Sequence, residues 1–321
     1  MTRCIGKLSF LSLLLIIILN NSCKKDIPAK THITNNVFIV VVDGARYSET
    51  WGNMFHQYIP HRSSMLAKGV MCKNFYNKGI TYTNPGHCAI ATGNYEYIDA
   101  SGLQKPSNPS IFQYFLKTYD RPSSEAWVIA SKDKLEAIAN CNNIDWKDAY
   151  TPMTDCGIAG IGTGYRKDSI TYFKLNTILQ IHHPRLVLTN FREPDYSGHA
   201  GDSLLYLKGI IDTDVYIDKL WEFIQTEPIY KNTTTLIVTN DHGRHTPGHS
   251  SGFVGHGDSC AGCRRIEFFA ISPDFKKNYI SPVPYELIDI SATVAKLLNI
   301  EMPTGKGKVM EDLFIKHYLQ K

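Results

Sequence analysis

Three short segments of the chain carry carboxylates that could bind a metal, and two of them also carry an imidazole. Asp43 stands alone, Asp195 and His199 are four residues apart, and Asp241 and His242 are adjacent. Hard or borderline divalent metals bind carboxylate oxygens and imidazole nitrogens together. The glycine before His199 would let the backbone turn so that both side chains of that pair face one ion. The adjacent pair could serve two different ions, an arrangement used for in-line displacement at phosphorus.

A threonine offers a nucleophile near these ligands. Thr83 begins the run Thr-Asn-Pro-Gly-His, in which Pro85 suits the first turn of a helix and Gly93 suits its end. Thr83 would then sit at or just before a helix N-terminus, where free N–H groups and the helix dipole favour an anion such as phosphate. A bound metal would activate its hydroxyl. The segment alone leaves two roles open, nucleophile and helix N-cap.

The apolar pattern predicts the elements that must position these residues. Continuous apolar runs predict buried strands over 37–42, 126–130, 186–189, 235–239 and 268–271. The spacing of apolar residues between them predicts helices over 110–119, 207–224 and 288–298. This alternation predicts an α/β fold, with a largely parallel central sheet and helices on both faces. Ligands bind beyond the carboxyl ends of such strands, where Asp43, Asp195 and Asp241 lie.

The composition limits the class of protein. The chain has 321 residues, of which 43% are hydrophobic and 20% charged, and this ordinary globular composition excludes wholesale disorder. The formal net charge of +4 is too small and too evenly spread to indicate a nucleic-acid-binding surface.

Residues 1–22 predict a signal peptide. Two basic residues precede the apolar run 8–19, which is too short to span a bilayer. The end of this run resembles a bacterial lipoprotein signal in which Cys23 carries the lipid. An ordinary cleaved signal and an N-terminal anchor are the alternatives. We expect residues 24–35 to form a tether, and we expect export to the cell envelope, as a periplasmic or outer-membrane lipoprotein that touches the membrane only through its lipid.

Six further cysteines follow Cys23, and an even number permits disulfides in an oxidising compartment. Cys141 with Cys156 and Cys260 with Cys263 are the local candidates. The second pair also has the spacing of half a zinc knuckle, but the chain has no other cysteine pair with that spacing.

Four motifs together resemble the alkaline phosphatase superfamily. They are Val42-Asp43-Gly44, Thr83-Asn84-Pro85-Gly86-His87, Asp195-x-x-Gly198-His199 and Asn240-Asp241-His242-Gly243. Their order is that of the family, and they are closest to its threonine-nucleophile branch, which contains nucleotide pyrophosphatase/phosphodiesterases and related bacterial phosphatases. The resemblance implies a single alkaline phosphatase-like catalytic domain over residues 36–321.

In that family each active site holds two divalent metals, commonly zinc, with manganese or magnesium as alternatives. Carried over to this chain, one ion would be bound by Asp43, Thr83, Asp241 and His242, and the other by Asp195, His199 and a later histidine. We prefer His256 as that histidine, because it precedes a strand that ends near a proline, as in the family. His249 competes with it, and His245 is also near.

The resemblance also implies a reaction. Thr83 would attack phosphorus and form a phosphothreonine intermediate, while Asn84 and Lys132 would bind the non-bridging oxygens. The run Lys132-Asp133-Lys134 resembles the Lys-x-Arg element that threonine-type alkaline phosphatases place on the phosphoryl group, with Lys134 in place of arginine. This element, and Gly86 where diesterases often have asparagine, favour a phosphomonoesterase acting on a small phosphorylated substrate.

Other functions stay open at this point. They are a type I phosphodiesterase or nucleotide pyrophosphatase, a phosphotransferase or phosphonate hydrolase with the same core, and a non-catalytic envelope binding lipoprotein. A sulfatase is disfavoured because Thr83 cannot form the formylglycine of that branch and the run lacks its arginine. Three arginines beside the motifs would line the pocket, lie on the surface or form salt bridges: Arg46, Arg192 and Arg244.

Overall fold

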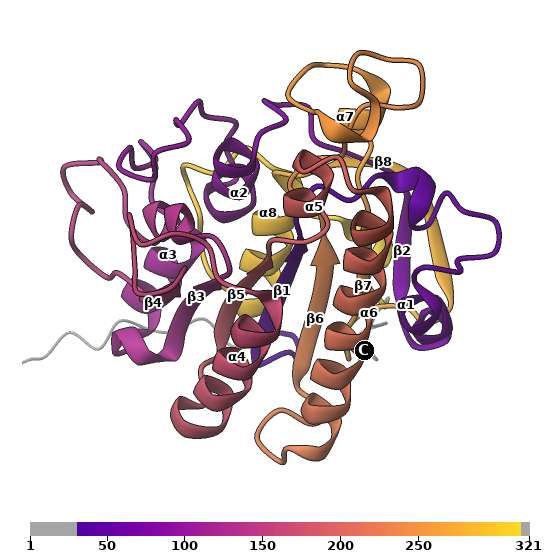
Figure 1. Ribbon diagram of the computed structural model, residues 1–321. Coiled ribbons are helices and arrows are strands. Elements are labelled where there is room, and N and C mark those ends of the chain that lie inside the picture. The colour runs from indigo at the N-terminus through magenta and orange to yellow at the C-terminus, as the bar shows by residue number, and fades with distance from the viewer. Residues whose placement is uncertain (1–30, 316–321) are drawn as a thin grey trace, which may run out of the picture.

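A single eight-stranded sheet organises the computed structural model, which describes residues 31–315 (Figure 1). The strand order is β4-β3-β5-β1-β6-β7-β2-β8. The predicted signal peptide, the lipid site at Cys23 and most of the predicted tether lie outside the described residues. The strands are β1 (Asn36–Val42), β2 (Val70–Tyr76), β3 (Ala126–Ala130), β4 (Met153–Cys156), β5 (Leu186–Phe191), β6 (Thr234–Thr239), β7 (Phe268–Ile271) and β8 (Tyr279–Glu286).

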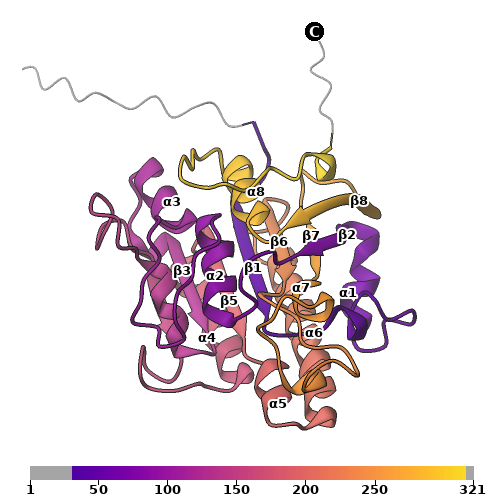
Figure 2. The same ribbon diagram turned by 90° about the horizontal axis from the view of Figure 1, so that it is seen from above.

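Helices connect the strands and cover the sheet. The α-helices are α1 (Pro60–Met65), α2 (Thr83–Thr92), α3 (Ile111–Tyr119), α4 (Asp168–His182), α5 (Asp195–His199), α6 (Ser203–Thr226), α7 (Ala261–Arg264) and α8 (Asp289–Leu298). A 3₁₀ segment, η4 (Asp133–Ala139), follows β3. Figure 2 shows the helices on both faces of the sheet. None of the helices within residues 31–315 is both long enough and apolar enough to cross a membrane.

The prediction of a largely parallel sheet is confirmed, with one exception. Strand β1 pairs in parallel with β5 and β6, and β3 pairs in parallel with β4 and β5. Strand β7 is antiparallel to both β6 and β2, so the sheet is mixed. The sequence analysis missed three strands. Of these, β4 is mostly polar, β8 contains two prolines that only an edge strand tolerates, and β2 turns polar after its first three residues.

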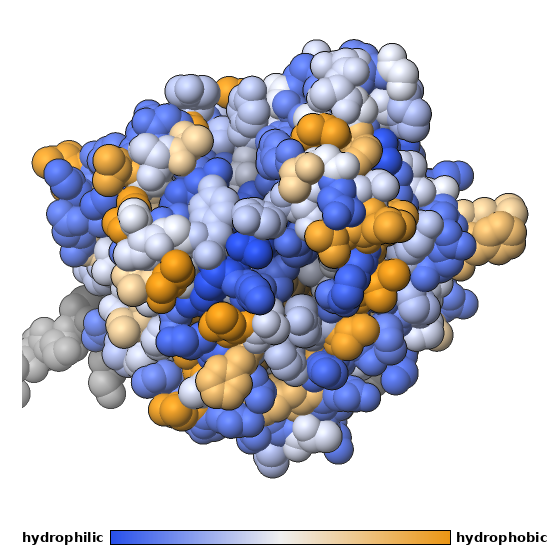
Figure 3. Space-filling model, viewed as in Figure 1, coloured by the Kyte–Doolittle hydropathy of each residue, from blue (hydrophilic) through white to orange (hydrophobic). Residues whose placement is uncertain are grey.

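The five buried strands are hydrophobic on both faces because each face packs against a layer of helices. In β1, Val37, Ile39 and Val41 point into a core that includes residues of α3 and α8. The alternate residues Phe38 and Val40 point into a second core that includes residues of α4 and α6. Polar residues cover most of the outer face seen in Figure 3, and its hydrophobic residues form small separate groups.

The two ends of the described chain meet at one residue. The backbone N–H groups of Ile33 and Thr34 donate to the carboxylate of Asp274, each over 2.8 Å. The N–H of Ile315 donates to the carbonyl of the same residue over 2.9 Å. These contacts precede β1, at the opposite end of that strand from Asp43, because the strand runs from Asn36 to Val42.

Candidate metal centre and active site

Adjacent strands β1 and β6 deliver one group of potential metal ligands, the strand-end cluster of Asp43, Asp241 and His242. All three side chains are fully buried. The Nε2 atom of His242 lies 3.6 Å from Asp43 Oδ1 and 3.5 Å from Asp241 Oδ2. Nδ1 lies 2.9 Å from the carbonyl of Gly243, so the Nδ1–H donates to it and Nε2 is left as an acceptor facing the carboxylates. Burial lowers the pKa of His242 to about 3, which keeps the ring neutral.

A helix and a loop deliver the second group, the helix-and-loop cluster of Asp195, His199 and His256. Asp195 and His199 lie one turn apart in α5, with His199 Nε2 3.4 Å from Asp195 Oδ1. His256 comes from the loop between β6 and α7, and its Nε2 lies 3.5 Å from the same oxygen. Its Nδ1 donates to the carbonyl of Thr81 over 2.8 Å. Burial lowers the pKa of His256 to about 4.

The expectation that Gly198 turns the backbone is wrong. Its residue is helical, and the i, i+4 spacing of α5 alone places Asp195 and His199 on one face. A Cβ at position 198 would instead lie 2.8 Å from the guanidinium of Arg244. Gly198 is therefore required by the close approach of Arg244, which forms an ion pair with Asp195.

The two clusters fit divalent metal ions. Oδ1 of Asp43 and Oδ2 of Asp241 are buried and have no hydrogen-bond partner within residues 31–315. Buried acceptors of this kind are rare because leaving them unpaired costs free energy. Nε2 of His199 and Nε2 of His256 lie 3.0 Å apart, and both lie within 3.5 Å of Asp195 Oδ1, so the three atoms converge on one point. Among residues 31–315, the three buried carboxylates of Asp43, Asp195 and Asp241 are paired with two lysine or arginine cations, Lys132 and Arg244.

His242 lies between the two clusters. Its Nε2 is grouped with the carboxylates of Asp43 and Asp241, and its ring also belongs to a group with Asp195 and His256. The rings of His242 and His256 are stacked, with centroids 3.9 Å apart. His242 therefore shares one group with Asp43 and Asp241 and another with Asp195 and His256, and the prediction that Asp241 and His242 serve different ions stays a prediction.

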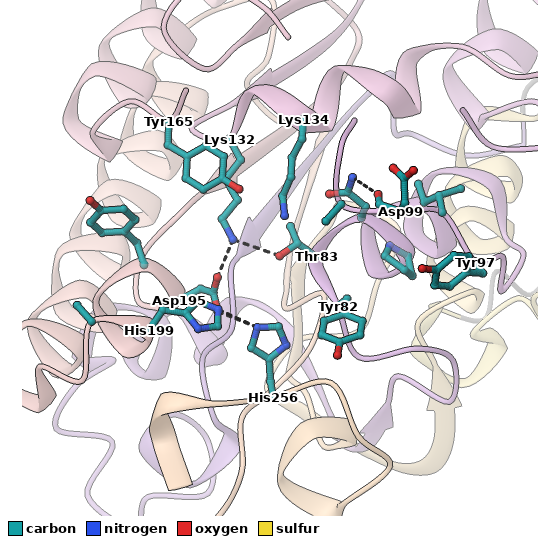
Figure 4. A pocket seen from close by; sticks show the side chains of 16 residues that line it. Tyr82, Thr83, Tyr97, Asp99, Lys132, Lys134, Tyr165, Asp195, His199 and His256 are labelled. Atoms are coloured by element: carbon teal, nitrogen blue, oxygen red, sulfur yellow. Dashed lines mark hydrogen bonds and ion pairs between the residues drawn. The ribbon is translucent and has the colours of Figure 1, made fainter. Parts of the chain in front are cut away.

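The predicted nucleophile and phosphate-binding residues surround the same space (Figure 4). Thr83 is the first residue of α2, and its Oγ1 lies 3.5 Å from His242 Nε2. Lys132 donates to Thr83 Oγ1 over 3.2 Å and to Asp195 Oδ2 over 2.7 Å. Although burial alone would lower it, the pKa of Lys132 is raised above its ordinary value by Asp195 and Asp43. Lys132 therefore carries a positive charge beside the Thr83 hydroxyl.

The other two predicted residues line the cavity in different ways. Lys134 is the second residue of η4 and points toward Thr83 in Figure 4. Burial and the nearby charge of Lys132 lower its pKa. Asn84 uses its amide N–H to hold the carbonyl of Asp99 over 2.7 Å, so that group is engaged with the protein. Its side-chain oxygen has no partner within the described residues, and the backbone N–H of Asn84 precedes the first hydrogen bond of α2.

An open cavity of about 660 Å³ leads to Thr83. Sequence reasoning missed its aromatic wall, which is formed by Tyr82, Tyr97, Tyr165 and Tyr196. Nothing in the spacing of these tyrosines identifies them, because Tyr82, Tyr97 and Tyr165 come from three separate non-helical segments and Tyr196 comes from α5. Sequence reasoning also left Arg244 undecided, whereas the structure buries it completely and pairs it with Asp195.

Two supporting residues also escaped the sequence analysis. Asn190, near the end of β5, donates to Asp43 Oδ2 over 3.0 Å. His87 lies with Nδ1 3.3 Å from Asp241 Oδ2 and 2.8 Å from the carbonyl of Thr83.

The two competing histidines, His245 and His249, lie together in a separate group with Asp258. All six cysteines within residues 31–315 are free, so neither candidate disulfide is formed.

Comparison with known protein families gives one match over most of the chain. The model described as the Metalloenzyme superfamily matches residues 35–302. Among curated proteins, the 2,3-bisphosphoglycerate-independent phosphoglycerate mutase of Onchocerca volvulus is 30% identical over 131 residues, which are 39% of this chain and 24% of the mutase. The mutase of the same name from Brugia malayi is 29% identical over 143 residues, 42% of this chain and 26% of that protein. The match thus spans about a quarter of these relatives.

Solved structures share the fold. Murine ectonucleotide pyrophosphatase/phosphodiesterase 5 superposes with a TM-score of 0.65 and 16% identity, covering 87% of this chain and 100% of that one. The phosphonate monoester hydrolase of Silicibacter pomeroyi gives 0.62 and 12%, covering 87% and 76%. The lipoteichoic acid synthase of Listeria monocytogenes gives 0.60 and 14%, covering 86% and 74%.

Proposed function

The chain belongs to the Metalloenzyme superfamily and has the alkaline phosphatase fold, and from this premise we propose that it is a metal-dependent phosphoric ester hydrolase with Thr83 as nucleophile. The observation that carries the proposal is the position of Thr83. Its hydroxyl lies at the start of α2, between Lys132 and the strand-end cluster, at the base of an open cavity. A helix cap would need none of these neighbours.

Two divalent ions fit the buried acceptors described above. One would be held by Asp43, Asp241, His242 and Thr83, and the other by Asp195, His199 and His256. When bound, such ions lower the pKa of the attacking hydroxyl and stabilise the negative charge of the leaving oxygen. Zinc suits this mixed carboxylate and imidazole set, and manganese is the alternative.

The residues of the chain supply the remaining steps. The Thr83 oxygen forms a bond to phosphorus while the bond from phosphorus to the ester oxygen breaks. The proton that the Thr83 hydroxyl gives up balances the one that the ester oxygen takes as it leaves as the alcohol. Lys132 and the free backbone N–H groups at the start of α2 hold the non-bridging oxygens. Water then attacks the phosphothreonine, which releases inorganic phosphate and restores the hydroxyl.

We favour a phosphomonoester substrate. Lys132 and Lys134 both extend into the cavity, and Lys134 has no ion-pair partner in the part of the chain that the structure describes. A phosphomonoester carries more negative charge than a diester, so two cations at one phosphoryl group suit it better.

A phosphodiester is the second candidate. The tyrosine wall of the cavity offers planar apolar surface to a second organic group on the phosphate. The likeness to a murine nucleotide pyrophosphatase/phosphodiesterase is consistent with this alternative but shows only the fold.

Paired initial rates test the choice. The full chain, stripped of metal and reloaded with zinc or manganese, is assayed on p-nitrophenyl phosphate and on bis-p-nitrophenyl phosphate. A preference for the monoester supports the phosphomonoesterase, and a preference for the diester moves the chain to the second candidate.

The nucleophile has its own test. We expect Thr83→Ala to lower kcat by at least about 10³-fold, because removing a catalytic nucleophile from an enzyme costs this much or more. Thr83→Ser keeps a hydroxyl and should retain part of the activity together with a phosphoprotein that mass spectrometry can trap at low pH. Wild-type turnover by metal-loaded Thr83→Ala would exclude the nucleophilic role.

A further inference from the structure

A third group of metal-binding side chains lies outside both clusters of the active site. His245, His249, Asp258 and Cys260, the surface cluster, all come from the loop between β6 and α7. Each offers one ligand atom, and these atoms lie within 4.8 Å of one another. From this geometry we propose that the surface cluster binds a zinc ion of its own. The inference goes beyond the proposed hydrolase, which needs none of these residues.

The spacing of the ligand atoms is close to that of a tetrahedral zinc site. Asp258 Oδ2 lies 2.8 Å from His249 Nε2 and 3.3 Å from His245 Nε2. With zinc–nitrogen bonds of about 2.0 Å and zinc–sulfur bonds of about 2.3 Å, ligand atoms at the corners of a tetrahedron are about 3.3–3.8 Å apart. The two separations at Asp258 are thus within about 0.5 Å of this range, and all four atoms lie within 4.8 Å of one another.

His245 supplies an independent observation that points to a ligand. Its side chain is only 7% exposed, and its Nε2 is buried with no hydrogen-bond partner within residues 31–315. The other ring nitrogen, Nδ1, lies 3.4 Å from Ser251 Oγ. Metal-binding histidines commonly engage one ring nitrogen in this way and direct the other at the metal. An ion in the surface cluster would give the buried Nε2 its missing partner.

The chemistry of the four ligands selects zinc. Two imidazoles, one carboxylate and one thiolate form a closed set of four, which is typical of structural zinc sites. A thiolate is a poor ligand for magnesium, calcium or manganese. The charges also balance, because the Asp258 carboxylate and the Cys260 thiolate together neutralise a divalent ion. His249 and Asp258 are exposed, which gives the ion a path from solvent.

Cys263 is the neighbouring cysteine with which Cys260 would form a disulfide. The Cys263 backbone N–H donates to Cys260 Sγ over 3.4 Å, so the two cysteines are close, although both are free. Cys263 is fully buried and is not part of the surface cluster. Cys263→Ser therefore serves as a matched control, because it prevents a Cys260–Cys263 disulfide but leaves all four proposed ligands in place.

A bound ion would stabilise the loop that carries His256. Asp258 lies two residues after His256, and both contact Thr81: its hydroxyl donates to the Asp258 carbonyl over 2.8 Å, and its carbonyl accepts from His256 Nδ1. The surface cluster thus lies beside the segment that leads to Thr83. This supporting role rests on the proposed function, but the metal site itself does not.

Cobalt substitution tests the proposal without an activity assay. The full chain is stripped of metal, reduced, and reloaded with Co²⁺, and the metal bound to each chain is counted by mass spectrometry. We expect wild type and Cys263→Ser to bind one ion more per chain than Cys260→Ser or His249→Ala. We also expect a near-ultraviolet thiolate-to-cobalt absorption band in the first pair and its loss in the second, because no cysteine lies among the candidate ligands of the active site.

Several results would overturn the proposal. They are an equal ion count in wild type and Cys260→Ser, no thiolate-to-cobalt band in wild type, or a band that Cys263→Ser abolishes as completely as Cys260→Ser does. Since His249 is exposed, His249→Ala is expected to fold even if Cys260→Ser does not. If the protein hydrolyses no phosphate ester but still shows the extra ion and the band, only the proposed function fails.

Discussion

The two halves of the candidate metal centre use similar ligands on very different supports. The strand-end cluster lies at the ends of neighbouring parallel strands, β1 and β6, and all its side chains are fully buried. In the helix-and-loop cluster, the His199 side chain is 52% exposed and His256 lies on a loop. The sheet cannot shift its ligands without breaking the core, whereas the short helix and the loop can move independently of it.

This difference has consequences for metal binding. We expect the strand-end cluster to be preformed and to exchange its ion slowly. The helix-and-loop cluster depends on secondary contacts, such as those of Arg244 with the carbonyls of Phe253 and Val254 just before His256. We expect it to exchange its ion faster and to respond more to the metal concentration.

We expect the largest effect from a change in the strand-end cluster. Asp43→Asn keeps the shape of the side chain but removes a charge from a site where Nε2 of His242 and Nζ of Lys132 converge. We expect activity to fall by more than the roughly 100-fold cost of losing an outer-shell partner. Because the site is enclosed, excess metal should not restore it. Initial rates measured across a metal titration check this, and recovery at high metal would contradict the comparison.

The helix-and-loop cluster should tolerate the loss of its exposed ligand, His199, better. His199→Ala removes a ligand at the rim, where water can replace the lost imidazole. We expect metal affinity at this half to fall about 10–100-fold, with activity returning as metal is added. The measurement is the metal concentration that gives half-maximal rate. His182→Ala, an exposed histidine on α4, is the control and should leave that concentration unchanged. A loss that no metal concentration repairs would make the two halves equivalent.

The smallest effect concerns Asp168, which supports the segment that leads into the helix-and-loop cluster. Asp168 accepts hydrogen bonds from the N–H groups of Arg192 and Glu193, just before α5, and from Ser131, just before Lys132. Burial raises its pKa to about 7. Between pH 4 and pH 7 the folded state therefore holds a proton that the unfolded state has lost, so the free energy of unfolding should fall as the pH rises through this window.

Asp168→Asn should flatten that part of the pH dependence. The measurement is urea unfolding at several pH values between 4 and 7, with Asp212→Asn, an exposed acid on α6, as control. We expect turnover at pH 8 to change by only a few-fold, because Asp168 touches no proposed ligand. An unchanged slope in Asp168→Asn would show that this carboxyl is ionised in the folded protein throughout the window.

The sequence was most informative where burial is symmetric. All five predicted strands exist because a strand covered on both faces leaves an unbroken apolar run, as in Val37–Val42. The edge strands β4 and β8 leave no such run, because many of their side chains are exposed to water. Helices α3, α6 and α8 were predicted from their apolar spacing, and their bounds differ by a few residues at most.

For the site, sequence reasoning located residues that follow strands but not those that arrive from loops by tertiary packing. Asp43 follows its predicted strand directly and Asp241 lies two residues after its own, so topology brings them together. The position of Arg244 against Gly198 depends on how the loop before His256 folds back, which no local pattern encodes. The surface cluster was missed for the same reason, because its members were considered one by one as spare histidines or as half of a cysteine pair.

The two ends of the described residues, near 33 and 315, meet at Asp274. Residues 33 and 315 leave from one spot, on the side of the sheet remote from Thr83, so the body has a single attachment point. A short linker between residues 31 and 315 would therefore suffice to join the two ends of the described residues in a circular permutation.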